Sequence, residues 1–309
     1  MKVILAQPRG FCAGVVRAID TVEDALLRYG APIYVRHEIV HNQHVVQSLE
    51  AKGVRFVEEL DDIPNNAITV FSAHGVSRAV EESASTRQLQ VIDATCPLVT
   101  KIHNHGRKYA ALGYQIILIG DPGHAEVVGI VGQIPSLVSV IENEAQVQTL
   151  SFDQGVSLAY ITQSTLSVDR TRGVVKALLQ RYPQIIGPDM RDICYAVQNR
   201  QSAVRELRQR VDMTLVVGAA NSANTLSLLE VATETGMPGY RVAHGGELRA
   251  EWFEGMHSVG ITAGASTPEV LVDDVLNALG RFAVLQIETL EGNEEYARFN
   301  LPQGLIARQ

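Results

Sequence analysis

Short apolar runs rich in Val and Ile alternate with longer amphipathic stretches along the whole chain, and this alternation limits the possible folds more than any other feature. Strands that alternate with helices are typical of parallel sheets in α/β proteins. Because the runs are almost continuously apolar, we expect strands that are covered on both faces. The predicted strands are residues 3–6, 33–35, 68–71, 91–93, 116–119, 158–161, 214–217 and 259–261. The clearest helical stretches are residues 15–29, 99–112, 168–181 and 204–210.

Three cysteines, Cys12, Cys96 and Cys194, divide the chain into stretches of similar length, and each stands at the start of a helical stretch. An odd number of cysteines argues against a disulfide framework. The spacing predicts three αβ units that each supply one cysteine to a shared centre. These predicted units are residues 13–96, residues 97–193, and residues 1–12 together with 194–280. Residues 281–309 are expected to be a tail that folds over another part of the protein.

The composition excludes several classes of protein. The net charge is −8, with 26 basic and 34 acidic residues, whereas a general nucleic-acid binder is usually basic. No apolar run is long enough to span a membrane. The chain opens directly on a strand-like run, without a charged leader or a signal-peptide core. We therefore expect a complete cytoplasmic protein that binds neither nucleic acid nor a membrane.

Polar residues gather directly after the predicted strands, where parallel α/β sheets bind their ligands. Helix starts at Ser222 and at Ser266 would offer N–H groups to a phosphate, and we expect Ser266 or its neighbour to cap a helix that begins at Pro268. Gly75 and Gly123 would let the backbone approach a ligand closely. The other polar residues at these strand ends are His41, His74, His124, Glu126, Ser164 and Asn224. Together they predict a site for a phosphate-bearing small molecule.

The nucleotide-binding motifs of common dehydrogenases and P-loop enzymes are absent from the sequence. A bound nicotinamide cofactor is therefore not expected. If the protein is a reductase, its electrons come from another protein.

The three cysteines suit two kinds of metal centre. They could hold zinc with a histidine as the fourth ligand, although structural zinc sites usually use closely spaced cysteine pairs. They also suit an iron–sulfur cluster in which one iron has no protein ligand and acts as a Lewis acid. Glu126 would then be a candidate proton donor if desolvation raises its pKa. The alternative for Glu126 is a solvated carboxylate at a helix start.

Ordered segments across the chain match the pattern of one enzyme family. From residue 3 to about residue 295, the sequence resembles the 4-hydroxy-3-methylbut-2-enyl diphosphate reductases, which act in the methylerythritol phosphate route to isoprenoids. The segments that carry the resemblance are PRGFCAGV at 8–15, VRHEIVHN at 35–42, FSAHGV at 71–76, DATCPLV at 93–99, GHAEV at 123–127, TQSTLS at 162–167, DICYA at 192–196, NSAN at 221–224 and TAGAS at 262–266.

The resemblance implies a trefoil of three pseudo-equivalent αβ units around one 4Fe-4S cluster held by Cys12, Cys96 and Cys194. It implies that the open iron binds the substrate hydroxyl and that two electrons, from ferredoxin or flavodoxin, release it as water. The products would be isopentenyl and dimethylallyl diphosphate. Glu126, Ser164 and His124 match the catalytic positions. The substrate-binding positions are matched by His41, His74, His124, Ser164, Ser222, Ala223, Asn224 and Ser266.

Three positions depart from the family's common residues. Ser164 replaces a common Thr and keeps the hydroxyl. Ala223 replaces a second Ser and leaves only its backbone N–H for a phosphate. Ala125 replaces a common Pro, which would loosen the turn before Glu126. The competing hypotheses are a quinolinate-synthase-like cluster dehydratase, a non-catalytic iron–sulfur redox sensor and a zinc-stabilised binding protein.

Overall fold

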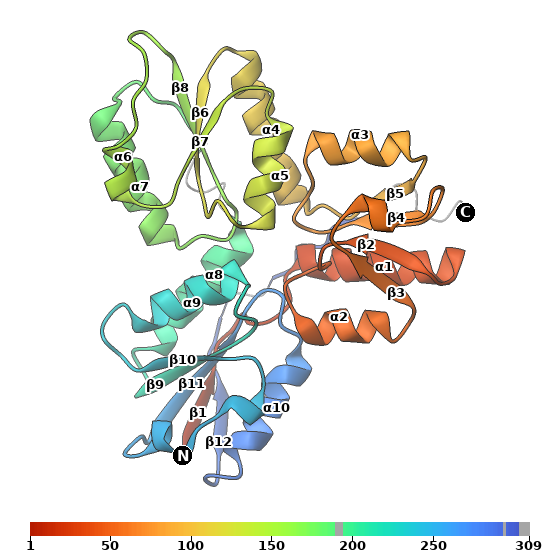
Figure 1. The fold of residues 1–309 in the computed structure, drawn as a ribbon. Coiled ribbons are helices and arrows are strands. Elements are labelled where there is room, and N and C mark those ends of the chain that lie inside the picture. Colours follow the sequence, from red (N-terminus) through yellow and green to blue (C-terminus); the bar gives the residue numbers. More distant parts are fainter. Residues whose placement is uncertain (189–193, 293–294, 303–309) are drawn as a thin grey trace. The chain divides into compact units, whose positions relative to one another are not determined.

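The computed structural model describes residues 1–188, 194–292 and 295–302, which form three parallel β-sheets flanked by helices (Figure 1). Every strand pairing in the three sheets is parallel, so the predicted α/β class with mainly parallel sheets is confirmed. The chain divides into two compact units. Unit 1 comprises residues 1–12, 41–43 and 194–297, and unit 2 comprises residues 13–40, 44–193 and 298–309.

Unit 1 contains one sheet of five strands, here called sheet A. Its strands, in spatial order, are β10 (Gly239–Val242), β9 (Met213–Val217), β11 (Ser258–Ala263), β1 (Lys2–Leu5) and β12 (Gln286–Thr289). The helical elements of this unit are α8 (Tyr195–Leu207), α9 (Ala223–Thr233), η3 (Gly245–Glu247), η4 (Ala250–Phe253) and α10 (Glu269–Leu279).

Unit 2 contains the other two sheets. Sheet B has the order β3 (Val54–Val57), β2 (Ile33–Arg36), β4 (Ile68–Phe71) and β5 (Gln90–Asp93), and sheet C has the order β7 (Val138–Ile141), β6 (Gln115–Ile119) and β8 (Leu158–Thr162). The accompanying helices are α1 (Ala13–Tyr29), α2 (Gln43–Glu50), η1 (Leu60–Asp62), α3 (Arg78–Thr86), α4 (Pro97–Ala111), α5 (Ala125–Gln133), α6 (Glu144–Val147) and α7 (Val168–Arg181).

Sheet A is covered on both faces, as its apolar strands predict. Along β9, Leu215 and Val217 pack in one core cluster with Val272 of α10. The intervening residue, Val216, packs in a different cluster with Leu228 of α9. Successive side chains of a strand point to opposite faces, so α10 covers one face and α9 the other. Sheet C shows the same alternation, because residues 117 and 119 pack toward α7 and residues 116 and 118 toward α5.

All eight predicted strands are present, with ends that differ by at most two residues. The sequence did not indicate β3, β7, β10 or β12, and each of these lies at the edge of its sheet. An edge strand carries polar residues because one side of it faces solvent. In β12 all four residues are exposed, so it lacks the apolar signal of a buried strand.

The helical stretch predicted at 204–210 overlaps the end of α8, which ends at Leu207. This helix begins at Tyr195 with Cys194 as its N-cap, which confirms the prediction that Cys194 stands at a helix start. One prediction about a helix start was wrong. Ser266 and its neighbour were expected to cap a helix beginning at Pro268. Instead Pro268 is itself the N-cap, with extended backbone, and α10 begins one residue later.

The predicted division into three units remains a prediction. The sheets fall at residues 33–93, at residues 115–162, and at residues 2–5 together with 213–289, whereas the packing gives two compact units. Part of the expected tail forms β12, which pairs with β1 and completes sheet A.

The two-sided burial of sheet C generates a stability prediction. Leu118 is 0% exposed, whereas Leu137 is 81% exposed. We expect Leu118→Ala to lower the free energy of unfolding by about 2–5 kcal/mol, because it leaves a cavity between β6 and α5. The matched change Leu137→Ala should alter it by less than about 0.5 kcal/mol. Urea unfolding of the full chain measures both, and equal midpoints would contradict the packing described here.

Candidate functional site

The loops that follow β1 and β11 run together at the carboxyl edge of sheet A. The Gly10 N–H donates to the carbonyl of Ala263, and the Cys12 N–H donates to the carbonyl of Ala265, both at 3.1 Å. Ser266 follows directly in the second loop. Because carboxyl ends of parallel strands share one edge, these loops lie where ligands bind in α/β sheets. Unit 1 therefore brings Cys12 close to the segment that carries Ser266.

The start of α9 provides a buried hydrogen-bond donor. Ser222 caps the helix, accepting at its hydroxyl from the Thr225 N–H at 3.3 Å. Asn224 is 4% exposed, and its Oδ1 accepts from the Ala265 N–H at 2.7 Å. Within the described residues, the Asn224 Nδ2 has no hydrogen-bond partner. A buried amide donor without an acceptor is costly, so this nitrogen suits a ligand oxygen. The Ala223 N–H stands beside it in the first helical turn, where main-chain donors lack partners within the helix.

His41 and Ser266 contact each other within unit 1. The Ser266 hydroxyl donates to the backbone carbonyl of His41 at 2.9 Å. The Asn221 Nδ2 lies 3.4 Å from the His41 Nδ1. The hydroxyl hydrogen of Ser266 is therefore committed to the His41 carbonyl, and Ser266 fixes the position of that residue.

Thr225, which the sequence analysis did not single out, explains two glycines at the strand ends. A Cβ on Gly218 would lie 2.3 Å from the Thr225 Oγ1, and one on Gly264 would lie 2.2 Å from it. Gly218 also has a φ of +156°, which favours glycine. The first turn of α9 can therefore pack directly against the ends of β9 and β11. Gly218, directly after a predicted strand, was the only sequence signal for this contact.

In unit 1, Cys12 and Cys194 both affect the pKa of the Tyr195 hydroxyl. Burial raises the pKa of Tyr195 to about 12, and the charges of Glu295, Cys12 and Cys194 add to that rise. Cys194 is the N-cap of α8, and Cys12 directly precedes α1. Both thiols are partly exposed, and neither forms a disulfide.

Cys96 lies in unit 2, at the N-cap of α4, and is also partly exposed and outside any disulfide. Asp93 holds the turn before it, because its Oδ1 accepts from the Thr95 N–H at 2.9 Å and from the Thr95 hydroxyl at 2.5 Å. Arg17 donates to the Thr95 carbonyl at 3.0 Å. Burial lowers the pKa of Arg17, while the charges of Asp93 and Cys96 oppose that shift. The sequence analysis quoted Asp93 and Thr95 in a motif but gave them no role.

Glu126 is a buried carboxylate held by Ser164. It is 2% exposed, so the alternative of a solvated carboxylate was wrong. The Ser164 N–H donates to its Oε1 at 2.7 Å, and the Ser164 hydroxyl donates to its Oε2 at 2.9 Å. The Glu126 N–H donates to the His124 Nδ1 at 3.1 Å, which makes His124 the N-cap of α5. The cap holds this turn although Ala125 stands where Pro is common.

His74 joins this group in unit 2. Its ring lies 5.7 Å from that of His124, edge to face, and its Nδ1 lies 3.2 Å from the Ser72 hydroxyl. The neighbouring Gly75 has a φ of +77°, and a Cβ there would lie 2.8 Å from Cε1 of His103. Packing of the His103 ring therefore accounts for the glycine at position 75. A Cβ on Gly123 would make only an ordinary contact, 3.5 Å from Asp121. The close approach of these two glycines to a ligand stays a prediction.

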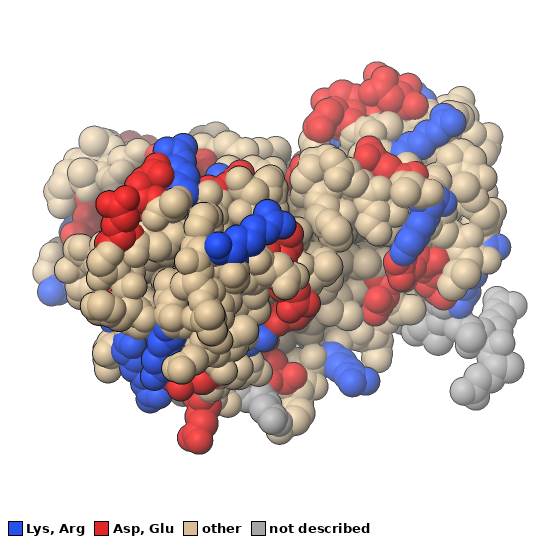
Figure 2. All heavy atoms as spheres, turned by 90° about the horizontal axis from the view of Figure 1, so that it is seen from below, with Lys and Arg blue, Asp and Glu red and all other residues tan. Residues whose placement is uncertain are grey.

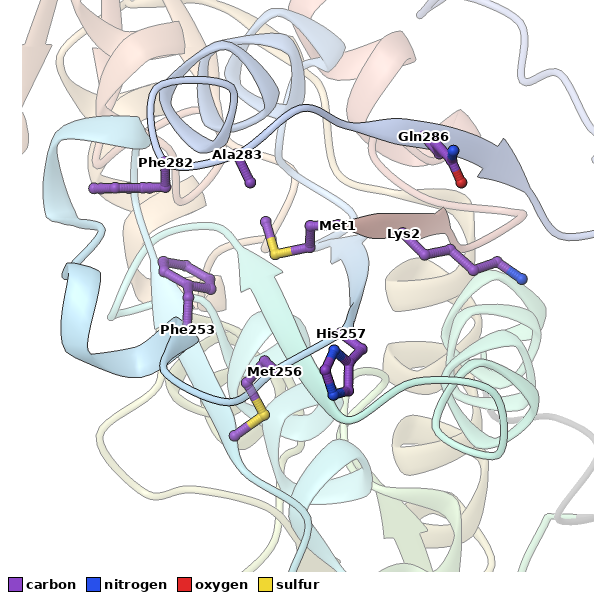
Figure 3. A pocket seen from close by; sticks show the side chains of 8 residues that line it. All are labelled: Met1, Lys2, Phe253, Met256, His257, Phe282, Ala283 and Gln286. Atoms are coloured by element: carbon purple, nitrogen blue, oxygen red, sulfur yellow. The ribbon is translucent and has the colours of Figure 1, made fainter.

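A cavity of about 450 Å³ in unit 1 lies away from these residues (Figure 3). Lys2 begins β1 and Met1 directly precedes it, while His257 directly precedes β11, so the cavity is at the amino ends of these strands. It includes none of the predicted site residues. On the face drawn in Figure 2, basic and acidic side chains are interspersed, and its described residues form no continuous basic patch.

Among the described residues, no group of three or more His, Cys, Asp or Glu side chains lies together in a way that could hold a metal ion. No helix in this part of the chain has the length and apolar character needed to cross a membrane.

Comparisons with known proteins give one consistent result. A family profile described as LytB protein matches residues 3–280. A 4-hydroxy-3-methylbut-2-enyl diphosphate reductase of Burkholderia pseudomallei is 58% identical over 100% of both chains. One from Azotobacter vinelandii is 50% identical over 99% of this chain and 98% of its own. A solved structure of the E-1-hydroxy-2-methyl-but-2-enyl-4-diphosphate reductase from Plasmodium falciparum has a TM-score of 0.94 at 36% identity, covering 99% of this chain and 96% of its own.

The buried His103 generates a pH prediction. Burial lowers its pKa from 6.5 to about 4. Between these two pH values, His103 is protonated in the unfolded chain but neutral in the folded chain. This contribution to stability is complete above pH 6.5 and is lost as the pH falls toward 4. From pH 7 to pH 4, we expect the wild-type free energy of unfolding to fall by up to about 3 kcal/mol more than that of His103→Gln. Urea unfolding measures this, with exposed His44→Gln as the control. Equal pH dependence in His103→Gln and wild type would refute it.

Proposed function

The chain belongs to the LytB protein family, and we propose that it carries out the reaction for which its curated relatives are named, the reduction of 4-hydroxy-3-methylbut-2-enyl diphosphate. The substrate takes up two electrons and two protons and loses its hydroxyl as water, giving isopentenyl or dimethylallyl diphosphate. The observation that carries the proposal is the buried carboxylate of Glu126, which is positioned by two hydrogen bonds from Ser164.

We propose that Cys12, Cys96 and Cys194 supply three thiolates to one 4Fe-4S cluster. Their chemistry fits such a group, because each thiol stands at a helix start and remains outside any disulfide. A helix N-terminus favours the thiolate form, which is the form that binds iron. When bound, the cluster supplies the electrons and one iron without a protein ligand, which serves as a Lewis acid for the substrate hydroxyl.

We propose that the substrate-binding positions implied by the family resemblance contact the diphosphate. In unit 1, the unpartnered Asn224 Nδ2 and the Ala223 N–H supply donors, and α9 presents the positive end of its dipole. The Ser222 oxygen accepts the cap bond, and its hydrogen can donate to a phosphate oxygen. The missing hydroxyl at Ala223 therefore leaves a main-chain donor in place. His41 completes the proposed unit 1 donors, and Ser266 is proposed to act through its hydroxyl bond to the His41 carbonyl, which holds that residue in place. His74 and His124 are the positions proposed for unit 2.

Glu126 is the proposed proton donor, with Ser164 as its positioning residue. The two hydrogen bonds from Ser164, one to each carboxylate oxygen, fix the orientation of the carboxyl group. His124 fixes the backbone at Glu126 through the cap of α5. Burial keeps bulk water from competing for the proton.

Ferredoxin or flavodoxin is the proposed electron donor, and the cytoplasm is the proposed compartment. A redox sensor would not require a buried proton donor or a buried donor directed at a phosphate. The quinolinate-synthase-like alternative has no observation in its favour.

The cluster proposal predicts a coloured protein. Purified without oxygen, the chain should be brown, contain about four iron atoms and bleach in air. Replacing Cys96 by Ser should abolish the colour, because only two thiolates remain. Metal analysis and visible absorbance measure both results, and a colourless wild-type protein with stoichiometric zinc would refute the cluster.

The proposed role of Glu126 predicts a loss of turnover without a loss of binding. Glu126→Gln keeps the size of the side chain but cannot donate an acidic proton, so we expect kcat to fall by about a hundredfold or more. Its iron content and substrate affinity should stay near wild type. The control is Glu82→Gln in the same unit, because that side chain is 69% exposed. Single-turnover assays with a chemical reductant separate proton transfer from electron delivery, and unchanged turnover in Glu126→Gln would exclude it as the donor.

A further inference from the structure

Arg200 is fully buried in unit 1, six residues after Cys194 along α8. A buried guanidinium is expensive unless each of its N–H groups finds an acceptor. Here all five have one. Nε and Nη2 donate to the Gly10 carbonyl at 3.0 and 2.8 Å, and Nη2 donates also to the Phe11 carbonyl at 3.1 Å. Nη1 donates to the Ala196 carbonyl at 2.9 Å and to Glu295 at 3.0 Å.

These acceptors connect the two cysteine-bearing segments of unit 1. The carbonyls of Gly10 and Phe11 belong to the two peptide groups directly before Cys12. Ala196 lies two residues after Cys194, in the first turn of α8. A single rigid side chain therefore ties the loop that ends at Cys12 to the helix that Cys194 begins.

The loop before Cys12 is fixed from its other side as well. The N–H groups of Gly10 and Cys12 donate to the segment that follows β11. Gly10 has a φ of +67°, and a Cβ there would lie 3.0 Å from the Thr267 carbonyl. The glycine allows the loop to lie between that segment and Arg200, which holds its carbonyl side.

Glu295 balances the buried charge. Its side chain is 13% exposed and accepts from the Arg200 Nη1 at both oxygens, at 3.0 Å each. The Asn199 Nδ2 donates to the same carboxylate at 3.0 Å. Glu295 comes after β12, in the region that the sequence analysis predicted to fold over another part of the protein. Within unit 1, this residue of the tail lies against α8.

We propose that Arg200 is a positioning residue for Cys12 and Cys194, and that Glu295 is the counter-ion through which the C-terminal segment holds it in place. The pair holds the Cys12 and Cys194 thiols in position before the cluster binds. Cluster binding therefore does not have to order the loop before Cys12. This inference rests on the proposed iron–sulfur function for its effect on the cluster, but the arrangement itself can be tested in the metal-free chain.

The first experiment measures cysteine reactivity in the full-length metal-free chain. Iodoacetamide labelling, read by mass spectrometry, gives the rates at Cys12 and Cys96 in the same sample, and Cys96 is the internal reference because it belongs to unit 2. In Glu295→Gln we expect the Cys12 rate to rise about tenfold relative to Cys96, since one charge-assisted bond that holds Arg200 is weakened. Arg200→Lys should act in the same direction, because an ammonium has three donors instead of five.

The matched control is Glu234→Gln. Glu234 pairs with Arg208, which directly follows α8, at 2.9 Å, so the control removes the same charge from an arginine next to the same helix. It should leave the ratio of the Cys12 and Cys96 rates unchanged. Glu295→Asp, which keeps a carboxylate, should restore part of the wild-type ratio.

The second experiment measures cluster loss to an iron chelator under anaerobic conditions. Changes in residues that orient metal ligands commonly weaken metal binding by about tenfold to a hundredfold, and we expect Glu295→Gln to lose its cluster about tenfold faster than wild type and Glu234→Gln. The proposal would be overturned if Glu295→Gln and Arg200→Lys lowered the melting temperature but left the labelling ratio and the rate of cluster loss at wild-type values. The pair would then serve only the stability of unit 1. A wild-type chain without a cluster would instead refute the proposed function, and the labelling ratio would still decide the role of Arg200.

Discussion

The parallel pairing of every strand in the three sheets is the constraint on which the rest of this structure depends. Parallel strands place all their carboxyl ends at one edge, so the loops that follow them meet even when they are distant in sequence. In sheet A this brings the loop after β1 beside the loop after β11, and main-chain bonds from Gly10 and Cys12 join them. The same pairing needs helices on both faces, and α9 and α10 supply these for sheet A.

Each unit contains a buried polar group whose hydrogen bonding suits one kind of chemistry. Glu126 in unit 2 is a carboxylate with both oxygens held by Ser164, which suits a group that must deliver a proton in a fixed direction. In unit 1, the side-chain oxygen of Asn224 is hydrogen-bonded, but its nitrogen has no partner among the described residues. This nitrogen suits a donor to an anionic ligand. The unpaired amide nitrogen of Asn224 costs folding free energy when no ligand is bound.

Arg200 shows how a helix can hold a cysteine that is distant from it in sequence. Cys12 ends the loop that follows β1, and this loop contains no regular structure to hold it. The guanidinium of Arg200 binds the two carbonyls before Cys12, and Glu295 compensates its charge. This connects the end of sheet A, the first turn of α8 and the C-terminal segment in one buried network.

The sequence by itself determined the α/β class, the central strands and the positions of the chemistry-bearing residues, because buried strands and helix starts carry strong local signals. It also indicated Cys12, Cys96, Cys194 and Glu126 as candidates. Only the tertiary structure showed that Glu126 is buried and bonded to Ser164, that His103 occupies the space beside Gly75, and that Arg200 binds the loop before Cys12. Edge strands such as β12 also went undetected. Each of these features depends on contacts between residues that are far apart in sequence or on exposure to solvent, and neither leaves a periodic pattern along the chain.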